Sequence, residues 1–448
     1  MEDHHSRAKF DSTFGFVMAA AGAAIGLGNV WGFPTQTAQN GGAAFVIVYL
    51  ILAFLLGYPV LMAEFIIGRH TRSNPIRAYQ RVPGGKPFVP VGVIGILTVG
   101  VVLSFYSIVA GWMMAHFLKP VFELIGAGQA AAWITARNTP DNMLLTSVFF
   151  LSTILIVLAG IKNGIEKWSK RFMPTLLIMI LLLAVYVMTL DGALDGIKLY
   201  LIPDINKILD GRLLLSAMGQ AFFSLSLGVG GMLVYASYLD KKENLVRIGI
   251  WVTLADVAVA FLAGLMVIPA LFVAAQNGTD IFNEQGELIS GPALIFQVLP
   301  ELFTGMGSVG MPLAIVFFAF MTIAALTSSI AMLEVPVAAV TEHLSLTRKQ
   351  ATWITGGLSW AVSMIIILNQ DWLFDLIVTV TTKYSQPFLG FMICIFAGWV
   401  FSRNAVLSEI KEGNPTAEHS WFMKVWPFFV KFVAPFLILL VFLHSLQA

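Results

Sequence analysis

The chain has 448 residues, of which 58% are hydrophobic and 11% are charged, and its mean hydropathy is +0.84. A soluble globular protein carries about 25% charged residues, so this composition excludes most soluble classes. The net charge of +1 excludes a basic surface that holds nucleic acid. The single cysteine, Cys394, excludes a disulfide framework and a cysteine-based metal cluster.

Apolar runs separated by polar breaks predict an all-α, polytopic membrane protein with eleven spans, since a span takes about 20 residues. With a cytoplasmic N-terminus, 19 of the 26 Lys and Arg residues fall on the cytoplasmic side and five fall outside. We therefore expect a multi-pass protein of the cell (inner) membrane, with the N-terminus cytoplasmic and the C-terminus extracytoplasmic. The expected spans are 13–38, 41–69, 91–120, 143–161, 168–190, 213–238, 246–276, 310–341, 349–369, 372–402 and 424–446.

The first and sixth spans carry glycine clusters near their centres, at Gly22, Gly26 and Gly28 and in the run 228–231 (GVGG). Close helix packing would explain either cluster alone. Clusters at matching positions five spans apart are instead typical of discontinuous helices in inverted repeats. Such breaks offer N–H groups to a carboxylate and carbonyl groups to a small cation.

The two breaks divide the chain into two five-span halves of opposite topology, because an odd number of spans inverts the second copy. We expect a first inverted repeat over 13–190 and a second over 213–402. A cytoplasmic N-terminal segment over 1–12 precedes them, and an extracellular loop over 191–212 joins them. A cytoplasmic loop and the eleventh helix follow over 403–448.

Several ordered motifs resemble those of the neurotransmitter:sodium symporters over about residues 7–402. Residues 22–34 (GAAIGLGNVWGFP) are similar to the first-helix signature, 219–226 (GQAFFSLS) to the sixth helix and 324–329 (AALTSS) to the eighth. The resemblance implies a bacterial-type, eleven-helix amino acid transporter, not an enzyme, with two sodium ions as cargo and no organic cofactor. It also implies alternating access, in which the first, second, sixth and seventh spans rock against the rest.

The resemblance implies one sodium site between the first and eighth helices. Its ligands are backbone carbonyls and two hydroxyls, a set of neutral hard oxygens that suits a monovalent cation. Back-bonding of the two hydroxyls to the preceding helical turn is the structural alternative. The expected residues are Gly22, Ile25, Ala324, Thr327 and Ser328.

The second implied sodium site uses Ala24, Asn29, Ser224 and a residue of the seventh helix. An alignment places Asp256 at that position, and a shift by one residue would place Ala255 there. Chloride-dependent relatives supply negative charge with a bound anion and a nearby serine, where this chain has Ala260. We therefore expect chloride independence, with Asp256 supplying the charge.

The substrate is expected beside these ions, with Leu27 and Gly28 offering N–H groups to its carboxylate and Tyr106 offering a hydroxyl. Relatives that carry monoamines have an aspartate where this chain has Gly26, so the glycine favours an amino acid. The adaptable break in the sixth helix suggests a neutral hydrophobic or aromatic one. The expected substrate contacts are Ala24, Gly26, Leu27, Gly28, Val102, Phe105, Tyr106, Phe223, Ser224, Ser226, Val229, Ser328 and Met332.

The expected outer gate departs from the family, which commonly has an arginine and an aspartate at the positions of Gly32 and Val378. Without that ion pair, Phe105 and Val229 would form an apolar lid. Lys383 follows Asp375 by about two turns in the tenth span. We weigh two roles for it, snorkelling to the membrane surface or acting with Asp375 in the outer gate.

On the inner side, the family pattern implies a gating ion pair between Arg7 and Glu342, with an ordinary juxtamembrane pair as the alternative. Glu64 and Glu334 lie within spans and are expected to cap unwound backbone rather than bind ions.

The sequence thus predicts a sodium-coupled amino acid symporter. The alternative is a proton-coupled or exchange-type carrier of the same architecture, in which Asp256 titrates. A channel is disfavoured because the chain has no repeated charged ring or filter loop. The seven histidines have no metal-ligand spacing, which disfavours a membrane metalloenzyme.

Overall fold

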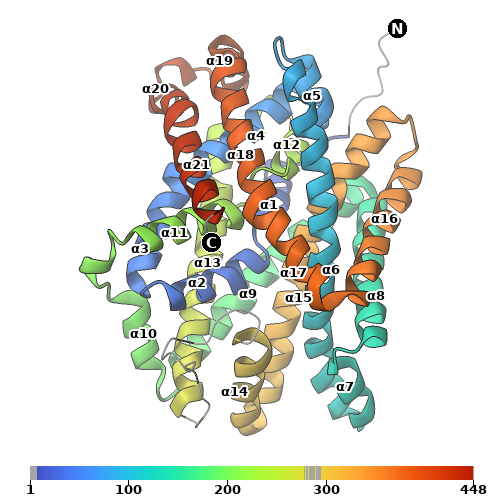
Figure 1. Ribbon diagram of the computed structural model, residues 1–448, viewed down its shortest axis with the longest axis vertical. Helices are drawn as coiled ribbons and strands as arrows, with labels where there is room; N and C mark the ends of the chain where they lie inside the picture. Colours follow the sequence, from blue (N-terminus) through green and yellow to red (C-terminus); the bar gives the residue numbers. More distant parts are fainter. Residues whose placement is uncertain (1–7, 277, 279–280, 282–287, 289–293, 447–448) are drawn as a thin grey trace.

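The computed structural model describes residues 8–276, 278, 281, 288 and 294–446. Within these residues the chain is helical and forms no β-strand. Figure 1 shows the helices running mostly along the long axis of the molecule. The helices α5 (Pro75–Arg81) and α19 (Arg403–Gly413) lie at one end, and α7 (Gly128–Thr135) and α14 (Leu299–Gly305) lie at the other.

The described residues contain 8 continuous helices that are long and apolar enough to cross a membrane, and two bent pairs that raise the number to 10. The sixth predicted span is split into two shorter helices, so the eleven-span, all-α architecture is confirmed. The spans in chain order are α1 (Thr13–Ala24) with α2 (Phe33–Gln39), α3 (Ala43–Leu52) with α4 (Tyr58–Thr71), α6 (Val89–Leu124), α8 (Thr139–Leu158), α9 (Lys167–Met188), α11 (Gly211–Ser224) with α12 (Gly231–Ala236), α13 (Leu245–Gln276), α15 (Gly310–His343), α16 (Arg348–Leu368), α17 (Gln370–Val378) with α18 (Gln386–Ile395), and α20 (Trp421–Phe428) with α21 (Ala434–Ser445).

Large apolar side chains cover the outside of several spans, where a soluble protein would carry charge. Leu151 and Leu155 of α8 are exposed, as are Ile178, Leu181 and Leu182 of α9. Such a surface is stable only against lipid, because apolar groups facing water would be costly. These helices therefore form part of the wall that faces the bilayer.

The first span bends by 52° between α1 and the π-helical segment Gly28–Gly32 that precedes α2. The bend follows from a changed hydrogen bond: Gly26 N–H donates to the side-chain oxygen of Asn29 at 3.1 Å. The carbonyl of Gly22, four residues earlier, is thereby released from the helical ladder. Carbonyl groups at this depth become available to other partners.

The sixth span breaks between α11 and α12, where Ser226, Gly228 and Gly230 have positive φ angles of 51°, 92° and 77°. These left-handed conformations stop the helix, and glycine adopts them without steric cost. The Glu64 side chain of α4 accepts hydrogen bonds from the N–H groups of Gly228 at 2.8 Å and Leu233 at 3.2 Å. Glu64 therefore caps the unwound backbone, as the sequence predicted.

Glu334 of α15 has a different role from the one predicted. Its carboxylate is fully buried and forms an ion pair with Arg348 of α16 at 2.6 Å. It also accepts a hydrogen bond from the hydroxyl of Tyr238 at 2.7 Å. The prediction that Glu334 caps unwound backbone is therefore wrong, because a nearby arginine neutralises the buried carboxylate instead.

Candidate functional site

A small cavity of about 50 Å³ lies where the breaks of the first and sixth spans meet α6 and α15. Every residue that the sequence predicted as a substrate contact lines this cavity, so the fold brings together side chains from four separate spans. The lining also includes residues that the sequence analysis did not name as substrate contacts: Ala23, Val99, Gly231, Met232, Ala331 and Gln386. No charged side chain is among the described lining residues, so backbone groups and hydroxyls supply the cavity's polarity.

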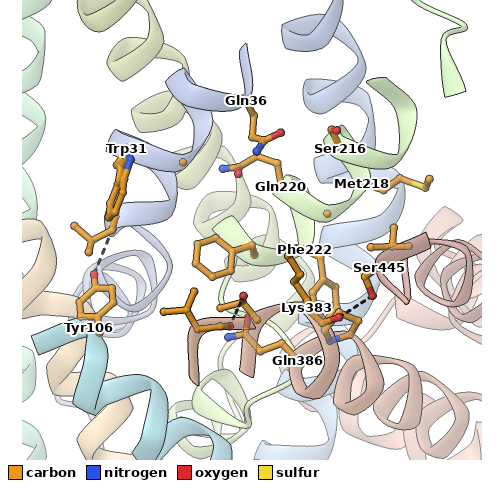
Figure 2. A pocket seen from close by; sticks show the side chains of 18 of the residues that line it. Trp31, Gln36, Tyr106, Ser216, Met218, Gln220, Phe222, Lys383, Gln386 and Ser445 are labelled. Carbon is orange, nitrogen blue, oxygen red and sulfur yellow. Dashed lines mark hydrogen bonds between the residues drawn. The ribbon is translucent and has the colours of Figure 1, made fainter. Parts of the chain in front are cut away.

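One side of this cavity is polar because the broken first helix exposes its backbone. Leu27 N–H donates a hydrogen bond to the Tyr106 hydroxyl at 3.3 Å (Figure 2). A methyl group on Gly26 would lie 2.5 Å from Ser328 Oγ and 2.7 Å from Tyr106 Oη. The absent side chain at Gly26 therefore keeps space beside the N–H group and the two hydroxyls, an arrangement that suits a carboxylate.

Three members of the predicted first sodium set, Gly22, Ile25 and Ser328, also meet. Ser328 Oγ lies 3.3 Å from the Gly22 carbonyl oxygen and 3.1 Å from the Ile25 carbonyl oxygen, across the gap between the first and eighth spans. Thr327 Oγ1, on the same helix, donates to the Ala324 carbonyl at 2.9 Å. The Thr327 contact is the back-bonding that the sequence analysis raised as an alternative. Ser328 instead bridges the two spans, and all five oxygens are neutral and hard.

The predicted second sodium set forms a buried hydrogen-bonded cluster. The Asn29 side-chain NH₂ donates to Ser224 Oγ at 2.9 Å and to Asp256 Oδ1 at 2.7 Å. Ser224 Oγ donates to Asp256 Oδ2 at 2.9 Å. The structure thus places Asp256, rather than Ala255, in contact with Asn29. The side-chain NH₂ group of Asn29 faces this cluster. The predicted sodium site instead needs the side-chain oxygen of Asn29 at this place.

Tyr49 of α3 is a member of this cluster that the sequence analysis missed. Its hydroxyl lies 3.2 Å from Ser224 Oγ and 3.4 Å from Asp256 Oδ2. The sequence could have pointed to Tyr49, because a tyrosine within an apolar span buries a hydroxyl group that needs a hydrogen-bond partner. Asp256 is fully buried, and the ion pairs among the described residues do not include it. The cluster therefore holds a carboxylate that hydrogen bonds stabilise but no side-chain cation neutralises.

A second, wider cavity of about 490 Å³ adjoins the small one (Figure 2). The two cavities share Leu27, Phe105, Tyr106, Phe223 and Gln386, which therefore form the boundary between them. Of the apolar lid that the sequence predicts, Phe105 lines both cavities. Val229 lines only the small cavity, whereas Phe223 lies on the boundary with Phe105.

Comparison with known proteins shows which family this chain is similar to. The chain matches the sodium:neurotransmitter symporter family over residues 7–142 and 139–448. It is 34% identical to the sodium-dependent transporter YhdH of Bacillus subtilis, with 97% of this chain and 96% of that protein covered. It is 29% identical to the sodium- and chloride-dependent taurine transporter of Bos taurus, with 77% and 62% covered.

Among solved structures, the chain resembles MhsT in complex with L-phenylalanine, with a TM-score of 0.85 and 33% identity. The match covers 98% of this chain and 100% of that one. The chain belongs to the sodium:neurotransmitter symporter family. It is a sodium-dependent transporter and not an enzyme.

Gly32 and Val378, which the sequence predicts at the outer gate in place of the family's charged pair, both line the wide cavity. Lys383 lines the same cavity, whereas Asp375 is exposed and is not among the described lining residues. The structure therefore does not bring Asp375 and Lys383 together as a gating pair. The Lys383 side chain is exposed, and the Lys383 backbone carbonyl accepts a hydrogen bond from the Ser445 hydroxyl at 2.9 Å.

A chain of aromatic rings bridges the first and tenth spans next to these neutral gate positions. The ring centroids of Trp31 and Phe296 lie 6.3 Å apart, and those of Phe296 and Trp112 lie 5.9 Å apart. Trp112 continues to Phe374 at 5.8 Å, and Phe374 continues to Phe105 at 6.1 Å. Three edge-to-face contacts and one tilted contact, between Trp112 and Phe374, therefore join the spans where the symporter family commonly uses an ion pair.

On the inner side, Arg7 lies outside the described residues. The Glu342 carboxylate accepts hydrogen bonds from the Asn74 side chain at 2.7 Å and from the Asn74 backbone N–H at 3.2 Å. Glu166, which the sequence analysis missed, accepts hydrogen bonds from Asp11 N–H at 2.6 Å and from the Ser12 hydroxyl at 2.9 Å. A carboxylate just before α9 thus holds the start of α1.

Proposed function

We propose that this protein is a chloride-independent symporter that couples the uptake of a neutral, hydrophobic or aromatic amino acid to sodium. The transporter works by alternating access, with the broken first and sixth spans at the centre of the moving unit. The observation that carries the proposal is the buried Asp256 carboxylate beside Asn29 and Ser224, since no described side-chain cation neutralises it.

Asp256 supports both sodium binding and chloride independence. An ionised carboxylate at membrane depth is costly unless a cation or a proton joins it. A sodium ion between Asp256, Ser224 and the Asn29 oxygen would satisfy it with hard oxygen ligands. For this the Asn29 amide must turn, because its NH₂ group now faces the carboxylate. A fixed carboxylate at this position removes the need for a bound chloride.

The proposed second sodium lies where Ser328 Oγ meets the carbonyls of Gly22 and Ile25. Bound there, the ion would join the unwound part of the first span to α15. Sodium at either place stabilises the conformation in which the small cavity is formed. Because binding linkage is reciprocal, the substrate then strengthens sodium binding by the same factor.

The small cavity supports an amino acid as the cargo. Leu27 N–H and the Tyr106 hydroxyl lie at the polar side, and the space at Gly26 admits a carboxylate. Apolar side chains, including Val102, Phe105 and Met332, line the rest. The resemblance to MhsT, whose structure holds L-phenylalanine, supports an aromatic or large apolar side chain.

The test is uptake of radiolabelled L-phenylalanine by purified protein in lipid vesicles, competed with each common amino acid. Replacing external sodium by choline should abolish uptake, and replacing chloride by gluconate on both sides should leave it unchanged. Uptake that requires chloride would refute the role proposed for Asp256. Competition only by charged amino acids would refute the proposed substrate class.

The alternative is a proton-coupled or exchange-type carrier, which the same Asp256 carboxylate favours because a proton can neutralise it as a sodium ion can. In that case uptake would persist in choline, and it would follow an imposed pH gradient in a proton-coupled carrier or require vesicles preloaded with the amino acid in an exchange-type carrier. Measuring uptake with and without that gradient, in sodium-free buffer, separates the two functions.

We also propose that the N-terminus is cytoplasmic, on the basis of the cationic residues that the sequence places on that side. Because the only cysteine, Cys394, is buried, single cysteines introduced elsewhere report accessibility. A cysteine at Lys86 should react with an impermeant reagent only from the cytoplasm, and one at Gly128 only from outside. The opposite pattern would reverse the orientation.

A further inference from the structure

The segment between the fifth and sixth spans carries apolar side chains that the proposed transport site does not use. The sequence predicts an extracellular loop over 191–212, and the structure forms the helix α10 (Ala193–Leu201) there, followed by a short 3-10 turn, Ile205–Lys207. Four exposed aliphatic side chains at the end of α10 and around this turn form what we call the apolar tip: Leu201, Ile202, Ile205 and Leu209. Ile205 is 75% exposed and Leu209 is 83% exposed. An exposed apolar patch of this kind marks contact with a partner or with a membrane.

Contacts with α13 fix the course of α10. A methyl group on Gly192, just before α10, would meet the side chain of Gln276 at the end of α13. Tyr200, near the other end of α10, donates its hydroxyl hydrogen to the Phe261 carbonyl at 2.7 Å. At 1.5 Å per residue, Phe261 lies about 22 Å along α13 from Gln276. The helix α10 therefore runs from the end of α13 toward its middle and brings the apolar tip with it.

The uncovered part of α13 shows what lies beside the apolar tip. Trp251, Leu254 and Ala258 are exposed and follow one another at helical spacing, so they form an apolar stripe that faces lipid. No residue of α13 from 261 to 275 is exposed, and α10 packs against this part of the helix. Phe261, which Tyr200 contacts, lies one turn beyond Ala258. The apolar tip therefore begins where the lipid-facing stripe of α13 ends.

The apolar tip also lies far from both ends of the molecule. Figure 1 shows the turn between α10 and α11 at the left edge of the bundle, between the end that carries α5 and α19 and the end that carries α7 and α14. Exposed charged side chains accompany it: Asp204 Oδ2 and Lys207 Nζ lie 3.9 Å apart, and Asp210 accepts a hydrogen bond from Arg212 N–H at 2.7 Å. Exposed aliphatic side chains beside charged ones are typical of a segment that lies at the level of the lipid headgroups.

We propose that the apolar tip inserts into the outer leaflet of the bilayer and anchors the start of the sixth span there. The lipid-facing stripe of α13 leads directly to it, which favours lipid as the occupant. A second copy of the chain is disfavoured, because a stable interface takes about 20–30 residues a side and the tip offers four. The name of the leaflet rests on the orientation proposed above, whereas the contact with lipid does not.

The anchor connects the bilayer to a broken helix of the transport site. Leu209 is followed by Asp210, whose carboxylate caps the N-terminus of α11 by accepting hydrogen bonds from the N–H groups of Arg212 and Leu213. The other end of α11 carries Ser224 of the buried Asp256 cluster. A movement of α11 must therefore carry the apolar tip through the lipid headgroup region, so the bilayer restrains this half of the sixth span.

The experiment places a nitroxide spin label on single cysteines of the full chain in lipid vesicles, which is possible because Cys394 is buried. Electron paramagnetic resonance measures collisions of each label with O₂, which concentrates among acyl chains, and with the water-soluble complex NiEDDA. Leu182→Cys on the exposed apolar face of α9 is the lipid reference. Gly128→Cys is the water reference, since a methyl group there would meet no atom within 4 Å. The test positions are Ile202→Cys, Ile205→Cys and Leu209→Cys.

At two or more test positions, collisions with O₂ should exceed collisions with NiEDDA, as at Leu182, whereas Gly128 should show the reverse. Fewer than two such positions would overturn the anchor. Dominant NiEDDA collisions would show that the tip lies in water, and few collisions with either reagent would show a protein partner such as a second copy. Thermal unfolding of each labelled variant identifies any loss of folding. The measurement needs neither sodium nor substrate, so its failure would leave the proposed function intact.

Discussion

The space at Gly26 gives a sharp test of the site. In a Gly26→Ala variant, the new methyl group would lie 2.5 Å from Ser328 Oγ and 2.7 Å from Tyr106 Oη. Both distances are well below van der Waals contact, so both hydroxyls must move. Ser328 bridges the carbonyls of Gly22 and Ile25, and its displacement disturbs the proposed sodium set as well as the cavity.

Overpacking of this kind costs about 1–3 kcal/mol, which corresponds to a loss of affinity of about 5- to 150-fold. We expect Gly26→Ala to raise the Kd for the amino acid by a factor in this range. The sodium concentration for half-maximal binding should rise as well, since one methyl group perturbs both ligands. The assay is equilibrium binding of radiolabelled L-phenylalanine at a series of sodium concentrations.

The matched control is Gly357→Ala in α16, where a methyl group would meet no atom within 4 Å. This variant should bind like wild type and be slightly more stable, because alanine favours a helix by about 1 kcal/mol over glycine. If Gly26→Ala binds substrate and sodium as the wild type does, the assignment of the cavity to the substrate carboxylate is refuted. A loss in both variants would point to a general effect of glycine replacement.

Three further predictions concern buried charges. Asp256→Asn should raise the half-saturating sodium concentration about 30-fold or more, since losing a buried charged partner costs at least about 2 kcal/mol; an unchanged sodium titration would contradict this. Glu64→Ala should destabilise the protein by about 2–6 kcal/mol, because the N–H groups of Gly228 and Leu233 lose their acceptor. Thermal unfolding in detergent measures this loss of stability. A variant as stable as the wild type would exclude Glu64 as the cap of the broken sixth span. The buried side chains of Arg69 and Glu409 form an ion pair at 2.5 Å. Arg69→Leu or Glu409→Leu alone should lower the free energy of unfolding by about 3–5 kcal/mol, and the double variant should lose much less. Additive losses in the double variant would disprove the pairing.

For the proposed function, the two helix breaks provide the polar groups that a core with few charges needs to bind ions and a zwitterion. The two breaks release backbone carbonyls and N–H groups at membrane depth, and Glu64 stabilises the second break from a neighbouring span. Hydroxyls of Ser224, Ser328 and Tyr106 complete the polar surface. Such groups can exchange a protein partner for an ion or a ligand at low cost, which a buried ion pair cannot do.

The sequence by itself determined the membrane architecture and the position of the central site. Apolar runs of sufficient length predict spans, and the glycine clusters predict where the first and sixth spans break, because both properties depend on local composition. The predicted contacts on the first and sixth spans line one cavity for the same reason, whereas those on the third and eighth spans reach it only through tertiary packing. Residues of the motifs at the breaks contact the cavity that the breaks themselves form.

The tertiary structure alone decided which side chains meet between spans. An α-helix has 3.6 residues per turn, so a shift of one residue rotates a side chain by about 100°. The sequence therefore left Asp256 and Ala255 as alternatives, and the packing of α13 placed Asp256 against Asn29. The partner of Glu334 depended in the same way on the packing of α16 beside α15, which brings Arg348 to it.

The contrast between Lys383 and Lys431 has the same origin. Each is a lysine within an apolar span, and the sequence surrounding them does not distinguish a cavity from a lipid-facing surface. The arrangement of the tenth and eleventh spans makes Lys383 an exposed residue that lines the wide cavity and places Lys431 on the Trp399 ring. Composition thus fixes how many spans form and where they break, whereas helix rotation and packing fix what each charged side chain faces.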